Sequence, residues 1–433
     1  MGSSGRSGNA HARPDHSFDE ALRAAFEPAA EREGRRRLRR LAGRWRATLR
    51  RLAPLGAVSY GNVVRRYDDG DELCEELWRA IDAARERVLV STYILAPDRV
   101  GRATMAALAR AAARGCAVRL RFDAVGSPRV MCPELDELLR CGATVEEFNP
   151  VLTWRSRLSR KLVRDHRKVV VVDGSVAFCG GMNFTEDYAG ERHGNGQFRD
   201  THLRLRGPVA ADLEVLFDDD DDDDGATVPR VRSATAPGEE SPAVGPAPVE
   251  QGALVQVLEA NRWRARRAIQ GAMLRTISRA GERVWLTSPY FVPPRRLSRA
   301  IRNAAKRGVD VRLLTAGVSD VPLARAIGRH LYARFLKAGV RIFELQGRTL
   351  HAKTEVIDGV YSSVGSFNLD VLSDRYNHEV NVGVLGPALA AELEADFERD
   401  TAAGREVRAD EPDARSLFEK ALGAIGYRLS KLL

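Results

Sequence analysis

The chain has 433 residues, of which 44% are hydrophobic and 29% are charged. This length and composition are enough for two or three domains with buried cores, and they exclude wholesale disorder and a small disulfide-stapled scaffold. The formal net charge is +9, but it is concentrated, because residues 31–52 hold ten arginines and two glutamates while residues 218–224 are seven aspartates.

The basic segment predicts an amphipathic helix over residues 35–53, inside a basic N-terminal region of residues 1–57. Its large apolar residues share one helical face and arginines cover the rest; they are Leu38, Leu41, Trp45, Leu49 and Leu52. Three roles are open. The helix lies on an anionic bilayer with Trp45 and the leucines in the interface, binds nucleic acid, or packs on the body with a solvated basic face.

The rest of the chain predicts two matching halves, at residues 58–217 and 251–410. Strand, helix and strand patterns recur in the same order, and residues 111–120 match residues 304–313 at seven of ten positions. Repeated βαβ units of this kind indicate a duplicated α/β architecture, not a solenoid.

Two flanking regions have simpler interpretations. Residues 218–250 combine the aspartate run with five prolines and are expected to form an acidic, proline-rich linker. The run lacks the spaced ligands of a calcium loop, so we expect a solvated stretch. Residues 411–433 predict a C-terminal helix that docks on the body, with Leu417, Leu422, Ile425, Leu429 and Leu432 near one face.

Each half contains one dense polar motif. The first has His166, Lys168 and Asp173, then Gly181 and Asn183; the second has His351, Lys353 and Asp358, then Ser366 and Asn368. The spacings from histidine to lysine, to aspartate and to asparagine are identical in both. The flanking apolar runs predict a β-hairpin turned at Asp-Gly, which brings the asparagine end beside the histidine and lysine, placed on one face of the strand.

This group of side chains suits a phosphodiester. A neutral imidazole can attack phosphorus, while lysine and asparagine donate hydrogen bonds to the oxygens where charge accumulates. A second imidazole can protonate the leaving alkoxide and then deprotonate an incoming alcohol or water. No carboxylate cluster suits magnesium, so we predict chemistry without metal or cofactor. A single His-x-Lys has little weight, but its repetition in full makes a purely structural role improbable.

The paired motifs resemble those of the phospholipase D superfamily, and the sequences that flank them are similar to its bacterial cardiolipin synthase branch. The resemblance implies a duplicated phospholipase D-like α/β/α sandwich with pseudo-twofold symmetry and both histidine–lysine pairs in one cleft. It also implies that an acidic residue after the asparagine orients the catalytic imidazole; the matching positions are Glu379 and Asp200. Ser366 and Gly181 fall where phosphate is bound, while Asp173 and Asp358 act in catalysis or in the hairpin turns.

The resemblance implies a phosphatidyltransferase that makes cardiolipin from phosphatidylglycerol through a phosphatidyl-histidine. Alternatives are a phospholipase D that forms phosphatidic acid and a metal-independent nuclease of the same superfamily. We expect an anionic phospholipid bilayer as partner, with no obligatory nucleic acid, and a peripheral location on the cytoplasmic side of the cell membrane. This favours the bilayer role for the basic helix.

Two further observations bear on the membrane. No apolar run long enough to span a bilayer is present, nor a secretory signal, which points to a span-free branch of the family. A basic patch before the first motif either steers anionic substrate or is an ordinary exposed loop; its members are Arg155, Arg157, Arg160, Lys161, Arg164 and Arg167.

Overall fold

The computed structural model describes residues 35–128, 130–150, 163–217, 231–233, 250–260, 267–410 and 416–429. The aspartate run, nearly all of the predicted linker, and Arg155, Arg157, Arg160 and Lys161 of the basic patch lie outside these residues.

One mixed sheet of sixteen strands crosses the described part of the chain. The first half contributes β1 (Ala57–Tyr67), β2 (Arg87–Thr92), β3 (Ala117–Asp123), β4 (Thr144–Phe148), β5 (Val169–Val172), β6 (Val176–Gly180) and β8 (His202–Arg206). The second contributes β10 (Glu250–Ala260), β11 (Arg283–Thr287), β12 (Asp310–Ala316), β13 (Arg341–Leu345), β15 (Thr354–Ile357), β16 (Tyr361–Gly365), β17 (Glu379–Leu385) and β18 (Gly404–Val407). β9 (Val231–Ser233) pairs with β1.

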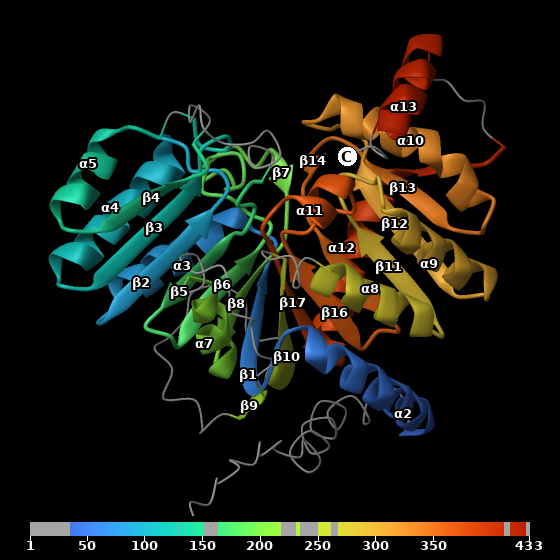
Figure 1. Ribbon diagram of the computed structural model, residues 1–433, viewed down its shortest axis with the longest axis horizontal. Coiled ribbons are helices and arrows are strands. Elements are labelled where there is room, and N and C mark those ends of the chain that lie inside the picture. Colours follow the sequence, from blue (N-terminus) through green and yellow to red (C-terminus); the bar gives the residue numbers. More distant parts are fainter. Residues whose placement is uncertain are drawn as a thin grey trace, which may run out of the picture.

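The strand order is palindromic about the centre of the sheet. From β1 outward the order is β8, β6, β5, β2, β3 and β4, and from β10 outward it is β17, β16, β15, β11, β12 and β13. β1 and β10 pair antiparallel, with Val58 opposite Gln256, so the two halves are related by a pseudo-twofold axis between them. Figure 1 shows the halves side by side with these two strands between them.

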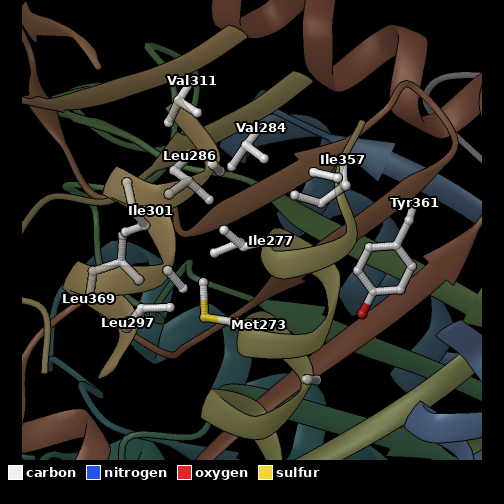
Figure 2. Packing of buried hydrophobic residues seen from close by; sticks show 14 of the residues in the cluster. Met273, Ile277, Val284, Leu286, Leu297, Ile301, Val311, Ile357, Tyr361 and Leu369 are labelled. Carbon is white, nitrogen blue, oxygen red and sulfur yellow. The ribbon is translucent and has the colours of Figure 1, made fainter. Parts of the chain in front are cut away.

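Helices cover both faces of the sheet. One face carries α3 (Gly70–Asp82), α4 (Arg99–Ala113), α5 (Pro133–Arg140), α8 (Ala268–Arg279), α9 (Arg295–Lys306) and α10 (Pro322–Leu336). The other carries α7 (Pro208–Glu214) and α12 (Pro387–Ala402). Alternating strand residues supply both cores: Val284 and Leu286 of β11 pack with α8 and α9, as Figure 2 shows, whereas Trp285 packs with Phe397 of α12. The predicted duplicated α/β/α sandwich is confirmed.

The basic helix forms, but its apolar face is not available to a bilayer. α2 (Arg35–Leu52) buries Leu41, Trp45, Leu49 and Leu52 in the core of the second half. Trp45 is 2% exposed and stacks on Tyr361 with ring centroids 5.2 Å apart. The favoured role, with these residues in the membrane interface, is therefore wrong for this structure; the helix packs on the body and leaves a basic face in solvent.

The C-terminal helix α13 (Leu417–Leu429) lies against α10, as Figure 1 shows. Ile425, predicted on its apolar face, is 56% exposed. No helix in the described residues is both long and apolar enough to cross a bilayer.

Candidate functional site

Both predicted hairpins form, and the histidine–lysine pairs stand just before them. His166 and Lys168 precede β5, and His351 and Lys353 precede β15. Because β5 runs antiparallel to β2, with Ser91 opposite Val169, the start of β5 lies beside the carboxyl end of β2. The sequence predicted that each pair lies on one face of a strand, and this prediction is wrong, because both pairs lie before the strand begins. Instead each lysine bends back, and Lys168 Nζ donates to the His166 carbonyl at 2.7 Å while Lys353 Nζ donates to the His351 carbonyl.

Each imidazole is held by a carboxylate from the opposite half of the chain. Nδ1 of His166 lies 3.0 Å from Oε2 of Glu379, which opens β17 in the second half. Nδ1 of His351 lies 2.6 Å from Oδ2 of Asp200 in the first half. The sequence named both carboxylates but did not reveal that they cross between the halves.

The backbone makes the crossing rigid. The N–H of His166 donates to the carbonyl of His378, the residue before Glu379, at 3.0 Å. The N–H of His351 donates to the carbonyl of Arg199, the residue before Asp200, at 2.8 Å. Short strands β7 (Phe198–Arg199) and β14 (Thr349–Leu350) pair beside the second contact. Each motif loop is therefore bonded to the segment that carries its carboxylate.

The two carboxylates fix the tautomer of the rings. A carboxylate only accepts hydrogen bonds, so each Nδ1 carries the proton and each Nε2 keeps its lone pair. Lys353 Nζ also lies 2.7 Å from Nδ1 of His351, but a protonated nitrogen cannot accept from it, so the ammonium donates to the carbonyl instead. Neither Nε2 has a hydrogen-bond partner among the described residues.

Glu379 has its own set of donors. The hydroxyls of Ser366 and Ser373 donate to it at 2.5 and 2.6 Å, and Asn377 donates at 3.2 Å. Ser366, predicted to donate to phosphate, donates its single proton to Glu379 in this structure, and this contact supports a role in positioning the carboxylate.

Gly181 occupies the position that matches Ser366 and makes room for the other carboxylate. A Cβ there would lie 2.1 Å from Oδ1 of Asp200, so no side chain fits without moving it. Asp200 is held in turn by the N–H of Thr201 at 2.7 Å.

The two asparagines have different surroundings. Asn183 is engaged, because its Nδ2 donates to the Tyr188 hydroxyl at 2.8 Å and its Oδ1 accepts the Ile94 N–H at 3.1 Å. Asn368 is also buried, but its Oδ1 has no partner among the described residues. Because the oxygen and nitrogen of a carboxamide exchange by a half-turn, that position can also present a donor to phosphate.

Burial and mutual repulsion set the charges of the site. Burial, and then the charge of Lys353, lowers the pKa of Lys168 to about 7, and burial lowers the pKa of Lys353 to about 8. Burial and Lys353 lower the pKa of His351 to about 4, against the pull of Asp200. Burial also lowers the pKa of His166, although the charge of Glu379 acts in the opposite direction and raises it. Both rings are therefore neutral near pH 7, as a nucleophile requires.

Electrostatic coupling also links the two motif pairs. The charge of Lys353 in the second half acts on both His166 and Lys168, and the charge of Lys168 acts on His351. The described residues thus bring two imidazoles, two ammonium groups and two carboxylates within reach of one another.

Asp173 and Asp358 lie in the hairpin turns, at the far end of each hairpin from its histidine. Asp173 accepts the N–H groups of Arg85, Glu86 and Arg87, each at 2.9 Å. Asp358 accepts those of Gly281, Glu282 and Arg283 at 2.8 to 3.1 Å. Both residues adopt positive φ, which suits a turn. Of the two roles that the sequence left open, these contacts support the turn.

Of the predicted basic patch, the structure describes only Arg164 and Arg167. Arg167 is buried and pairs with Asp165 at 2.8 Å, and Arg164 lies 3.5 Å from Asp123. These two arginines are part of the fold and not a steering surface. The described residues contain no group of three or more histidine, cysteine or acidic side chains that could hold a metal ion.

Sequence reasoning missed the aromatic residues around the histidines. The Tyr188 hydroxyl lies 3.3 Å from Nδ1 of His351, and its ring stacks on Phe198 at 4.7 Å. The ring of Tyr93 meets His166 edge-on at 4.9 Å and lies 5.2 Å from Lys168 Nζ. The only sequence signal for them was position, because Tyr188 follows Asn183 by five residues and Tyr93 lies in the apolar run 88–97, directly after the end of β2.

Comparison with known proteins agrees with this geometry. The family model described as "Cardiolipin synthase, PLD-like domain" matches residues 77–219 and 273–401. Cardiolipin synthase A of Pseudomonas fluorescens strain Pf-5 is 32% identical over 390 residues, which cover 89% of this chain and 78% of that protein. Cardiolipin synthase A of Pseudomonas aeruginosa strain LESB58 is 35% identical over 374 residues, covering 86% and 73%. The crystal structure of phosphatidylserine synthase from Haemophilus influenzae Rd KW20 has a similar fold, with a TM-score of 0.66 at 14% identity, covering 89% of this chain and 98% of that one.

Proposed function

This chain belongs to the cardiolipin synthase family of phospholipase D-like enzymes, and from that premise we propose that it transfers a phosphatidyl group between two phosphatidylglycerol molecules. The products are cardiolipin and glycerol. The observation that carries the proposal is the pair of imidazoles whose Nδ1 atoms are held by carboxylates of the opposite half, because this arrangement leaves two basic Nε2 atoms for one phosphodiester.

In the first step, Nε2 of one histidine attacks the phosphorus of the donor lipid. A P–N bond forms, the P–O bond to the headgroup glycerol breaks, and the other imidazole gives its proton to the leaving alkoxide. Binding of the phosphodiester anion raises the pKa of that imidazole, so its Nε2 takes up a proton from solvent before it acts as the acid. Lys168, Lys353 and Asn368 are suited to hold the equatorial oxygens.

In the second step, the headgroup hydroxyl of another phosphatidylglycerol attacks the phosphatidyl-histidine. Its proton passes to the second imidazole, the new P–O bond forms, and the P–N bond breaks. Glu379 and Asp200 stabilise whichever ring is positively charged at each stage, so the assignment of carboxylates does not depend on which histidine is the nucleophile.

The direct test is turnover of phosphatidylglycerol vesicles by the purified full-length protein in excess EDTA, followed by lipid chromatography. We expect cardiolipin and glycerol at a rate that EDTA does not change. A product that is mainly phosphatidic acid would instead support a phospholipase D, and plasmid cleavage without lipid turnover would support a nuclease. Loss of activity on chelation would contradict the metal-independent mechanism.

Variants of the two histidines test whether they share one site. His166→Ala and His351→Ala are each expected to abolish turnover, because each step uses both rings. A variant of either histidine with a near-normal rate would contradict the mechanism.

We propose a peripheral location on the cytoplasmic side of the membrane, where the substrate lipid is available. This is supported by the names of the relatives, which are synthases of the membrane lipid cardiolipin. Labelling of intact and opened cells with a membrane-impermeant reagent distinguishes the two sides.

A further inference from the structure

Most of the exposed large apolar side chains lie in the segments that follow β3, β12 and the second motif. The described residues contain eight large hydrophobic side chains that are exposed. Six of them follow β3, β12 or Asn368 in the chain, and we call this set the site rim: Val125, Met131, Val318, Val321, Leu323 and Leu372. Met131 is the most exposed of all, at 73%.

In the first half the rim is tied directly to the histidine loop. Val125, 48% exposed, comes just after β3, and its N–H donates to Oδ1 of Asp123 at 2.8 Å. The other oxygen of Asp123 accepts the N–H of Asp165, the residue before His166, at 2.9 Å. One carboxylate therefore holds both the rim loop and the catalytic loop.

The second half repeats the arrangement with different residues. Val318 and Val321 follow β12, and between them Asp320 accepts the hydroxyl of Tyr290 at 2.7 Å. The Asp320 carboxylate acts electrostatically on Lys353, so this loop also lies beside its motif. Leu372 is in α11 (Val371–Arg375), directly after Asn368. Both halves thus place exposed apolar side chains next to their own histidine.

We infer that the site rim inserts into the apolar layer of an anionic phospholipid leaflet. Insertion places the two histidines at the depth of the lipid headgroups. The inference rests on the proposed function, because the substrate is then a bilayer lipid whose phosphodiester lies at the depth of the headgroups. Exposed apolar patches of this kind mark interaction surfaces, and the affinity of interfacial binding grows with the apolar area that is buried.

The rim is a better candidate than α2 for this contact. The large apolar residues described on α2 are already buried in the core. Moreover, Arg44 of α2 lies 3.5 Å from Asp358, in the hairpin turn remote from His351. Figure 1 shows α2 at the lower right of the molecule and α11 well above it, between the two halves, so a bilayer on α2 would lie away from α11.

Paired charge insertions test the inference. Met131→Asp and Val318→Asp, in one protein, are compared with the control Leu139→Asp, a residue 47% exposed near the end of α5 and outside the rim. Sedimentation with phosphatidylglycerol vesicles should show at least a roughly tenfold weaker affinity for the rim variant and no change for the control. Equal affinity of the rim variant and the wild type would overturn the inference.

A second variant strengthens the contact instead. Met131→Trp should bind the same vesicles more tightly and shift its fluorescence to shorter wavelength on binding, because the indole enters the interface. No shift would contradict insertion. A rim variant that changes the sedimentation mass of the lipid-free protein would show that the rim joins two copies of the chain, which also overturns the inference.

Soluble substrate separates this inference from the proposed function. With short-chain phosphatidylglycerol below its micelle concentration, the rim variant should turn over as fast as the wild type. A wild type inactive on every phosphatidylglycerol substrate would refute the proposed function, whatever its vesicle affinity. An active wild type whose rim variant keeps full vesicle binding would refute only the rim.

Discussion

Replacing Glu379 with glutamine removes one charge from the site and little volume. Glu379 accepts hydrogen bonds from His166 and three other side chains, and in both proposed steps its charge faces a ring that becomes cationic. Two unit charges roughly 4 Å apart at an effective dielectric constant of 20 attract by about 4 kcal/mol. Loss of that attraction in the transition state lowers the rate by about a thousandfold.

The assay is cardiolipin formation from phosphatidylglycerol, with thermal unfolding measured alongside. Glu355→Gln is the matched control, because Glu355 is equally buried, accepts a hydrogen bond from Thr276, and has a pKa that burial raises to about 7. We expect Glu379→Gln to lose about three orders of magnitude in kcat with its fold intact, and the control to stay within about threefold of wild type. A Glu379→Gln enzyme within tenfold of wild-type kcat would refute the cross-half role of this carboxylate.

Three other perturbations have defined outcomes. Gly181→Ala should lower kcat at least a hundredfold, because its Cβ displaces Asp200 from His351, while Gly43→Ala, whose Cβ meets nothing within 4 Å, should leave kcat unchanged. Trp45→Ala should destabilise the protein by about 3–5 kcal/mol in chemical denaturation without weakening vesicle binding, since the indole is a core side chain. The value of kcat/KM should fall as pH rises through 7 to 8, because Lys168 and Lys353, with pKa values of about 7 and 8, lose the charge that attracts phosphate; a flat profile to pH 9 would contradict this.

The duplicated fold could be predicted because its signals are local. Apolar runs, Asp-Gly turns and a repeated motif are written in consecutive residues, and both hairpins formed where the sequence placed them. The crossing of Glu379 to His166 and of Asp200 to His351 could not be predicted in this way, because it depends on how two distant segments meet across the pseudo-twofold axis.

The basic helix illustrates a different limit. Its periodicity identified the buried face correctly, but an amphipathic pattern does not say whether the apolar face meets a bilayer or a protein core. In the structure, Trp45 packs on Tyr361 and neighbouring apolar side chains of the second half. Nothing in the sequence of residues 35–52 indicates this partner. The contact of the Ser366 hydroxyl with Glu379 could not be predicted for the same reason, since its acceptor is thirteen residues away.

The central claim is that both histidines act on one phosphorus, and a crystal structure with orthovanadate tests it most directly. We predict a single vanadate in the site, with Nε2 of one histidine as an axial ligand, Nε2 of the other hydrogen-bonded to the opposite axial oxygen, and the two lysines on the equatorial oxygens. Two separate vanadate ions, or one ion that contacts only His166 or only His351, would contradict the account.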